Sequence, residues 1–331
     1  MISELDRFRG CLLGVAIGDA LGTPYEMKSR SEILKMTNGK GILGFDPNIS
    51  RKRDDDLELL TSDDFGLTEI IGWSLIRRKC FDIVDIALAH VETLEKNGTL
   101  GWGSTTRNGV LELKEYFDSR GMKGRSPFET PKHIERKGCG NGIAMKIAPI
   151  SLIYRNWSKL FEYCISVGKL THSDPKSWTA AFAISKLLKA PEDWNNKDIL
   201  EWLQVECINF EIWVENHFGK FSEYLNPLIC DNNRLLYAPI EELAEKIGTS
   251  SLSTESVVFS IAVYLRNKTD FRKGVLEAVN AGGDSDSIAS IVGSLIGYNV
   301  GIEGIPEEWV EYSPEFKNAI ILADELYASF R

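Results

Sequence analysis

Two glycine-rich segments constrain the fold of this 331-residue chain more than any other feature. In both segments glycine recurs at every fourth position, namely Gly10, Gly14, Gly18 and Gly22 in the first and Gly293, Gly297 and Gly301 in the second. Residues four apart lie on one face of a helix, so each predicted helix has a stripe without side chains. Glycine costs about 1 kcal/mol per site inside a helix, and close packing of backbone against backbone is the compensation we expect.

Acidic residues stand at the ends of both glycine-rich segments. Asp19 and Glu26 lie at the end of the first, while Asp284 and Asp286 open the second. Close packing of the two helices would therefore bring these carboxylates together.

The rest of the chain shows amphipathic helical periodicity, and alternating strand patterns are nearly absent. We expect an all-α fold. No Ser/Gly-rich or Pro-rich linker divides the chain, so a single domain over 1–331 is predicted. The expected helices are 4–22, two within 65–96, 106–118, 143–154, 158–170, 175–189, 197–216, 239–247, 254–266, 271–280, 286–300 and 315–329.

Composition excludes several functional classes. There are 38 Lys and Arg against 48 Asp and Glu, a net charge of −10, and no basic block, which argues against stable binding of nucleic acid. The N-terminus lacks the pattern of a secretory signal, and no apolar stretch approaches the roughly 20 residues of a membrane span, so we expect a cytoplasmic protein without membrane insertion. Six cysteines without CxxC spacing argue against a zinc site or a disulfide scaffold.

The most specific motif is the segment 282–287, where two glycines precede Asp284, Ser285, Asp286 and Ser287 at the start of a buried helix. One carboxylate there is explained by helix capping alone. Two carboxylates and a hydroxyl exceed what capping requires, so metal ligation is favoured. Such hard oxygen ligands suit Mg²⁺, Mn²⁺ or Ca²⁺.

A second acidic cluster, Thr61 to Asp64, precedes another apolar helix and could complete the site. The nearby run Asp54 to Asp56 competes for this role, but it is flanked by Arg51–Arg53 and no helix follows it directly. We interpret that run as a solvated loop.

Three further segments join small or hydroxylated residues to helix starts, where free N–H groups favour phosphate. They contain Gly103, Ser104 and Thr105, then Gly140, Asn141 and Gly142, and finally His172. Taken singly, each is better explained as an ordinary capped loop, and a lone histidine is more often structural than catalytic.

Taken together, these motifs resemble the ADP-ribosylglycohydrolase family, which includes the dinitrogenase reductase activating glycohydrolase. The matching segments follow the family's order from near residue 7 to near residue 309. They are 7–14 with 18–22 and Glu26, 62–64, 103–107, 140–145 with Pro149, 171–172 and 282–287.

The resemblance implies an all-α fold with two Mg²⁺ ions, or alternatively Mn²⁺, in a central cleft. By position, the metal ligands would be Ser62, Asp63, Asp64, Asp284, Asp286 and Ser287. The three segments around Gly103, Asn141 and His172 would contact the substrate. The implied reaction is hydrolysis of the bond between the C1″ carbon of ADP-ribose and a modified protein or small molecule, with Asp63, Asp64 or Glu26 as proton acceptor.

Two departures from the family pattern leave alternatives open. Phe65 replaces a hydroxyl residue after the first acidic pair, and serines replace threonines at 285 and 287. The serines keep their hydroxyls, whereas Phe65 could reshape the first metal site. A catalytically weak or inactive ADP-ribose-binding protein is therefore one alternative, and a metal-dependent phosphohydrolase is another.

Overall fold

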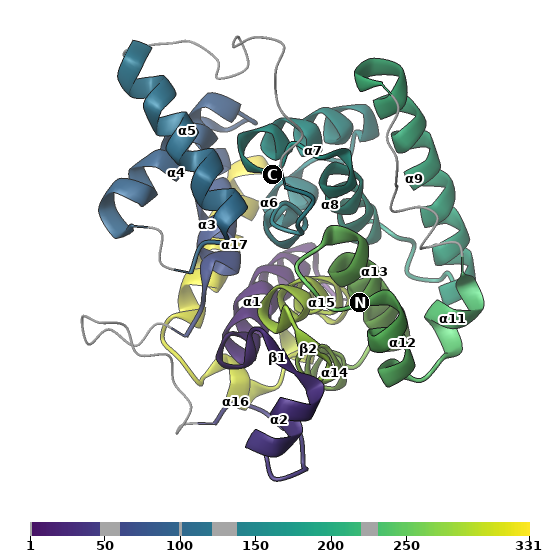
Figure 1. The fold of residues 1–331 in the computed structure, drawn as a ribbon. Helices are drawn as coiled ribbons and strands as arrows, with labels where there is room; N and C mark the ends of the chain where they lie inside the picture. Colours follow the sequence, from purple (N-terminus) through teal and green to yellow (C-terminus); the bar gives the residue numbers. More distant parts are fainter. Residues whose placement is uncertain (1, 47–59, 99–100, 121–137, 220–230) are drawn as a thin grey trace.

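The computed structural model describes residues 2–46, 60–98, 101–120, 138–219 and 231–331. Helices dominate these residues, which confirms the predicted all-α class (Figure 1). The α-helices are α1 (Glu4–Gly22), α2 (Arg30–Met36), α3 (Asp63–Arg78), α4 (Ile83–Asn97), α5 (Ser104–Arg120), α6 (Ala148–Ile153), α7 (Trp157–Thr171), α8 (Pro175–Leu187), α9 (Asn196–Phe218), α11 (Asn232–Tyr237), α12 (Ile240–Ile247), α13 (Ser253–Arg266), α14 (Phe271–Ala281), α15 (Ser285–Val300), α16 (Glu307–Val310) and α17 (Phe316–Phe330). Short 3₁₀ helices are η1 (Thr23–Tyr25), η3 (Ala144–Lys146) and η4 (Ile302–Gly304), and the strands are β1 (Lys28–Ser29) and β2 (Gly282–Gly283).

The predicted helices agree with the observed ones except where elements are short. The sequence analysis missed α2, α11 and α16, which are too brief to show a clear period. The helix expected over 143–154 is divided into η3 and α6, and Pro149 lies in the first turn of α6. Proline has no N–H to donate, so it is accommodated where a new helix begins.

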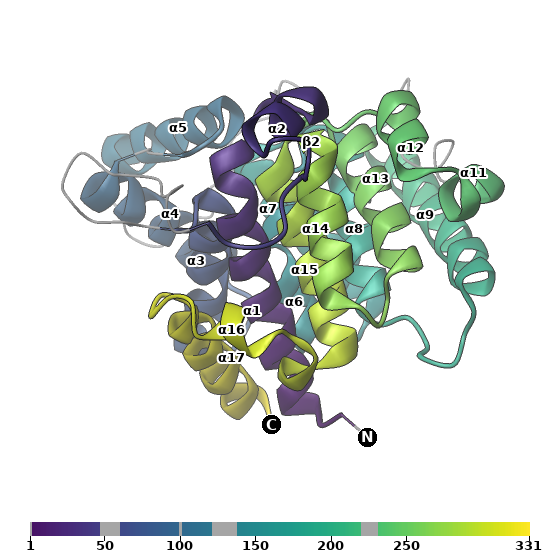
Figure 2. The ribbon, with the colours of Figure 1, turned by 90° about the horizontal axis from the view of Figure 1, so that it is seen from below.

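The two glycine stripes face each other at the centre of the molecule. A Cβ atom built on Gly10 would lie 2.2 Å from the carbonyl oxygen of Gly297, and one on Gly14 would lie 2.1 Å from that of Gly293. At the far end of α1, a Cβ on Gly22 would lie 2.3 Å from the Cα of Asp286. The backbones of α1 and α15 therefore touch along their length, and the pairing is antiparallel (Figure 2).

This antiparallel pairing brings the end of α1 beside the start of α15, as the positions of the acids predicted. The short strands β1 and β2 reinforce the junction, because Lys28 pairs with Gly283 and Ser29 pairs with Gly282. Both glycines have positive φ values, 77° and 78°, and a Cβ on Gly283 would lie 2.2 Å from the carbonyl oxygen of Thr249. Glu26, just before β1, is thereby held near Asp284, just after β2.

The remaining helices surround this central pair. In Figures 1 and 2, α13 and α14 flank α15, while α3 and α17 lie against α1. A continuous apolar core runs through these contacts and includes nearly all of α1 from Gly10 onward. Among the described helices, none combines the length and apolar character needed to cross a membrane.

Candidate functional site

Asp19, near the end of α1, binds the N-terminus of α3. Its Oδ1 atom accepts the backbone N–H of Ser62 at 2.8 Å, and its Oδ2 atom accepts that of Phe65 at 2.9 Å. The Asp19 side chain is fully buried, and this burial raises its pKa to about 6 although the hydrogen bonds oppose the shift. Asp19 thus fixes the start of α3, and with it the acidic pair Asp63 and Asp64, against α1.

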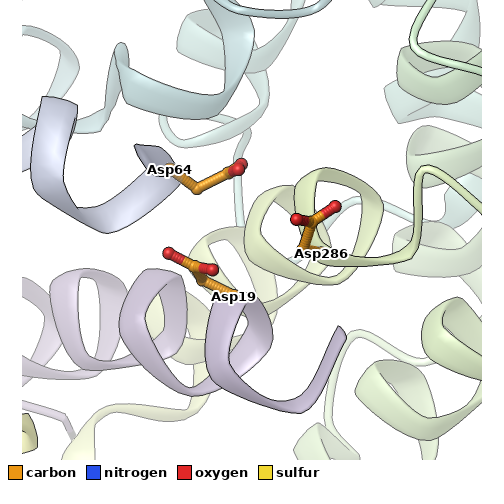
Figure 3. A group of neighbouring side chains, drawn as sticks. All are labelled: Asp19, Asp64 and Asp286. Carbon is orange, nitrogen blue, oxygen red and sulfur yellow. The ribbon is translucent and has the colours of Figure 1, made fainter. Parts of the chain in front are cut away.

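Asp64 points into a group of three buried carboxylates. One carboxylate oxygen from each of Asp19, Asp64 and Asp286 lies within 4.8 Å of the others, although the residues come from α1, α3 and α15 (Figure 3). The Oδ1 atom of Asp64 is buried without a hydrogen-bond partner among the described residues. Its Oδ2 atom accepts the hydroxyl of Ser287 at 3.3 Å. Burial, together with the charges of Asp19 and Asp286, raises the pKa of Asp64 well above its usual range.

Asp286 also belongs to a second group, which it forms with Glu26 and Asp284. Asp284 occupies the N-cap position of α15, but within the described chain its carboxylate makes no capping hydrogen bond. It accepts instead from the side-chain amide of Asn141 at 2.5 Å. Helix capping therefore does not account for Asp284. Burial and the charges of Asp284 and Glu26 raise the pKa of Asp286 well above normal.

The structure brings several of the predicted metal ligands together, and Asp63 lies close enough for its charge to raise the pKa of Asp64. Asp63 is half-buried and lies outside both carboxylate groups, and burial and the charge of Asp19 raise its pKa to about 7. The hydroxyl of Ser62 is 3.5 Å from Asp64 Oδ2. Asp19 was not among the predicted ligands, although its place at the end of the glycine stripe was the signal for it. The alternative acidic run 54–56 lies outside the described residues.

Phe65 is a core residue. It lies in the first turn of α3 and its side chain is only 1% exposed. Its backbone N–H still serves the site, because it donates to Asp19. The substitution therefore leaves both acids of the 62–64 motif in place.

Residues 138–142 support the site through backbone and side-chain amide contacts. Asn141 donates its backbone N–H to the carbonyl of Ser251 at 2.9 Å, and its side-chain amide donates to Ser256 Oγ at 3.0 Å as well as to Asp284. Ser177 Oγ donates to the carbonyl of Gly140 at 2.7 Å. Since the N–H and amide groups of Asn141 already have partners, Asn141 acts in this structure by orienting Asp284. Substrate contact by residues 140–142 stays a prediction.

His172 packs against this loop as a neutral side chain. A Cβ on Gly142 would lie 2.5 Å from the His172 ring, and the ring Nδ1 is 2.9 Å from Thr171 Oγ1. Burial lowers the pKa of His172 to about 3. Thr105 approaches the same loop, because a Cβ on Gly138 would lie 2.1 Å from its methyl carbon. Gly103 and Ser104 are exposed where α5 begins, and their role in substrate binding stays a prediction.

A buried lysine that the sequence analysis missed lies beside the acidic pair. Lys146 in η3 is fully buried, and its Nζ atom has no hydrogen-bond partner among the described residues. Burial lowers its pKa to about 8, while the charges of Asp63 and Asp64 act in the opposite direction. The available signal was a lysine inside the apolar run 143–150.

The chemistry of this site fits a divalent cation. All of the gathered donors are oxygens, their like charges raise one another's pKa values, and one oxygen of Asp64 is buried with no hydrogen-bond partner in the described part of the chain. Hard cations such as Mg²⁺ prefer oxygen ligands, and a bound cation would offset this repulsion. The fold and the site thus define an all-helical protein with a buried carboxylate centre between its two central helices.

Comparison with known proteins agrees with this class. The family model for ADP-ribosylglycohydrolase matches residues 2–331, and the chain belongs to the ADP-ribosylglycohydrolase family. The mouse protein ADP-ribosylhydrolase ARH3 (Mus musculus) is 25% identical, and the alignment covers 99% of this chain and 93% of the mouse protein. ADP-ribosyl-[dinitrogen reductase] glycohydrolase of Rhodospirillum rubrum is 23% identical over 92% of this chain and 89% of its own length.

A solved structure confirms the fold. A chain of an "ADP-ribosylglycohydrolase-related protein complex" superposes with a TM-score of 0.69 at 21% identity, covering 99% of each chain. The family is one of hydrolases, and the match confirms the resemblance inferred from the motifs.

Proposed function

We propose that this protein is a metal-dependent ADP-ribosyl hydrolase that cleaves the glycosidic bond at C1″ of ADP-ribose. The observation that carries the proposal is the meeting of two carboxylate groups that share Asp286, all buried except the half-buried Glu26, with an oxygen of Asp64 that has no hydrogen-bond partner among the described residues. So many neighbouring carboxylates destabilise the folded protein when they are buried and charged, unless a cation binds among them.

The residues that would hold the cations are Asp64 and Asp286, with Asp19 on one side and Glu26 and Asp284 on the other. When bound, divalent cations supply positive charge that holds ribose hydroxyls and offsets the charge of an attacking water. The protein's part is to keep these carboxylates fixed: Asn141 orients Asp284, and the hydroxyl of Ser287 orients Asp64. The number of ions, two, and their identity, Mg²⁺ with Mn²⁺ as a substitute, belong to the proposal.

Two carboxylates can accept the proton of the attacking water as the bond breaks through an oxocarbenium-like state. Asp63 belongs to neither of the two carboxylate groups, and on that ground it is one candidate acceptor. Glu26 is half-buried at the edge of the second group. Asp64, the third predicted acceptor, lies beside Asp19 and Asp286 and accepts from Ser287, and these neighbours support a role in holding a cation.

The substrate class follows from the names of the relatives and from the family. One relative is named for ADP-ribosyl-[dinitrogen reductase] and others are named ADP-ribosylhydrolase. We propose that this protein releases ADP-ribose from a modified protein side chain or from a small molecule. The released group is to be identified with a panel that includes arginine-linked, serine-linked, base-linked and small-molecule ADP-ribose.

Product analysis on this panel, with Mg²⁺ or with EDTA, tests the proposal. Free ADP-ribose formed only with metal is the expected result. AMP and ribose phosphate would indicate a phosphohydrolase, and binding without turnover would indicate an ADP-ribose-binding protein. The buried position of Phe65 and the intact acidic pair beside it favour the enzyme over the binding protein.

Asp284→Asn is the sharpest variant, because Asn retains the approximate size of Asp but not its charge, and it is also tolerated at a helix N-cap position. Its matched control is Asp270→Asn at the N-cap of α14, where Asp270 Oδ1 accepts the N–H of Lys273 at 3.0 Å. We expect at least a hundredfold loss of turnover in Asp284→Asn and none in Asp270→Asn. Full activity of Asp284→Asn, or of the wild type in EDTA, would overturn the metal mechanism.

The proton acceptor is identified by comparing Asp63→Asn with Glu26→Gln across pH. Removal of the base eliminates the acidic limb of the kcat/KM profile, whereas removal of the other carboxylate shifts the rate but keeps the limb. If both variants keep the limb, neither residue is the base.

A further inference from the structure

Lys146 is a buried basic group that the proposed mechanism leaves without a role. Its side chain is fully buried, and its Nζ atom makes no hydrogen bond to any described residue. An ammonium group without hydrogen bonds in a protein interior is costly, so it persists only where nearby charge compensates for the lost solvation.

The position of η3 places Lys146 beside the start of α3. The preceding residue, Met145, contacts both acidic helices: its carbonyl lies 3.5 Å from Thr68 Oγ1 of α3, and its sulfur lies 3.8 Å from Ser287 Oγ of α15. η3 therefore lies between the N-terminal parts of these two helices.

Because η3 packs against α3, the charges of Asp63 and Asp64 act on Lys146 and favour its ammonium form. In the reverse direction, the charge of Lys146 lowers the pKa of Asp63 against the effect of burial. His90 and His172 also feel the charge of Lys146, and burial lowers the pKa of each to about 3, so both are neutral; α15, which also packs against η3, opens with Asp284 and Asp286. Among the described residues, Asp63 and Asp64 thus act on Lys146 through space, because its Nζ atom makes no hydrogen bond to either.

We propose that Lys146 is the resident counter-charge of the carboxylate cluster, a positioning residue that holds the acidic pair of α3 in the metal-free protein and competes with the incoming cation. The proposal rests on the proposed function, because the competitor is the divalent cation of that site. Its physical basis is Coulombic. A cation that enters beside Asp64 is repelled by a fixed positive charge, and burial leaves little solvent to screen that repulsion.

The direction in which removal of Lys146 changes the affinity for the cation separates this role from a purely structural one. A lysine that only filled space or supported the loop would, on removal, loosen the site and weaken cation binding. A counter-charge, on removal, strengthens cation binding. Lys146→Met retains most of the side-chain length without the charge, and Lys146→Arg retains the charge.

The experiment is isothermal titration calorimetry of Mn²⁺ and of Mg²⁺ into the full chain without substrate. The matched control is Lys186→Met in α8. Lys186 is equally buried, at 1% exposed, but it pairs with Glu206 at 3.1 Å and lies over the ring of Trp157. We expect Lys146→Met to bind the cation about tenfold more tightly than the wild type, and Lys146→Arg and Lys186→Met to stay within about threefold of it.

Unchanged or weaker binding by Lys146→Met would overturn the inference while leaving the proposed function intact. Binding by Lys146→Met where the wild type shows none would support it. If neither chain binds a cation, the metal mechanism fails and the inference fails with it. Lys146→Gln, which is neutral but polar, gives the same comparison if Lys146→Met does not fold by far-UV circular dichroism.

Discussion

Gly14→Ala tests whether direct backbone contact between α1 and α15 holds the carboxylate groups together. A Cβ atom at residue 14 would lie 2.1 Å from the carbonyl oxygen of Gly293 and 2.5 Å from its carbonyl carbon. Ordinary contact begins near 3.4 Å, so the two backbones would have to separate by about 1.3 Å. Backbone atoms in the middle of two buried helices cannot turn aside as a flexible side chain can.

Two terms of opposite sign determine the size of the effect. Inserting a methyl group into a well-packed core costs about 1–3 kcal/mol, and contact with backbone favours the upper end of that range. Alanine gains about 1 kcal/mol over glycine from its helix propensity. We therefore expect a net loss of about 2 kcal/mol in the free energy of unfolding.

The matched control is Gly66→Ala in α3. A Cβ atom on Gly66 would meet no atom within 4 Å, so only the propensity term applies and we expect a gain of up to about 1 kcal/mol. The assay is urea unfolding followed by far-UV circular dichroism, with calorimetric titration of Mn²⁺ on the same samples. Gly14→Ala should also weaken Mn²⁺ binding, because separation of the helices moves Asp19 away from Asp286.

A Gly14→Ala variant as stable as the wild type would refute this reasoning. So would a Gly14→Ala variant that loses stability but binds Mn²⁺ as tightly as Gly66→Ala does, because the glycine stripes would then support the fold without positioning the acids.

Three further predictions concern the ligand, Phe65 and pH. ADP-ribose at one hundred times its Kd should stabilise the fold by about 2.7 kcal/mol in Mg²⁺ and much less in EDTA, and equal thermal shifts would contradict the coupling of ligand to metal. Phe65→Thr should lower Tm because it removes a buried ring, but kcat/KM per folded molecule should change by no more than tenfold, about 1.4 kcal/mol. If the wild type is inert and Phe65→Thr gains metal-dependent hydrolysis, the natural protein is instead an ADP-ribose-binding protein. Burial and the charge of Glu315 raise the pKa of Glu69 to about 7, so the stability that comes from its neutral form is fully present below about pH 4.5 and is lost as pH rises through 7. Glu69→Gln should therefore raise Tm at pH 8 and change it little at pH 5. Equal shifts in Tm at both pH values would show that Glu69 does not have this raised pKa.

The local sequence determined the helices and much of the site. Periodicity predicted the all-α class and most helices, because an amphipathic face leaves its spacing in the sequence. The glycine stripes predicted backbone contact, and the acids at their ends predicted that Glu26, Asp284 and Asp286 would meet. These features can be predicted because each depends on one segment of the sequence, or on two segments with matching patterns.

Only the tertiary structure decided which partner each side chain has. Asp19 binds backbone N–H groups of residues 62 and 65, and Asn141 orients Asp284 across 143 positions of sequence. The burial of Lys146 beside Asp63 likewise depends on η3 packing between α3 and α15. Hydrogen bonds and electrostatic interactions fall off within a few ångströms, so they depend on where distant segments come to rest, and no spacing along the chain encodes that position.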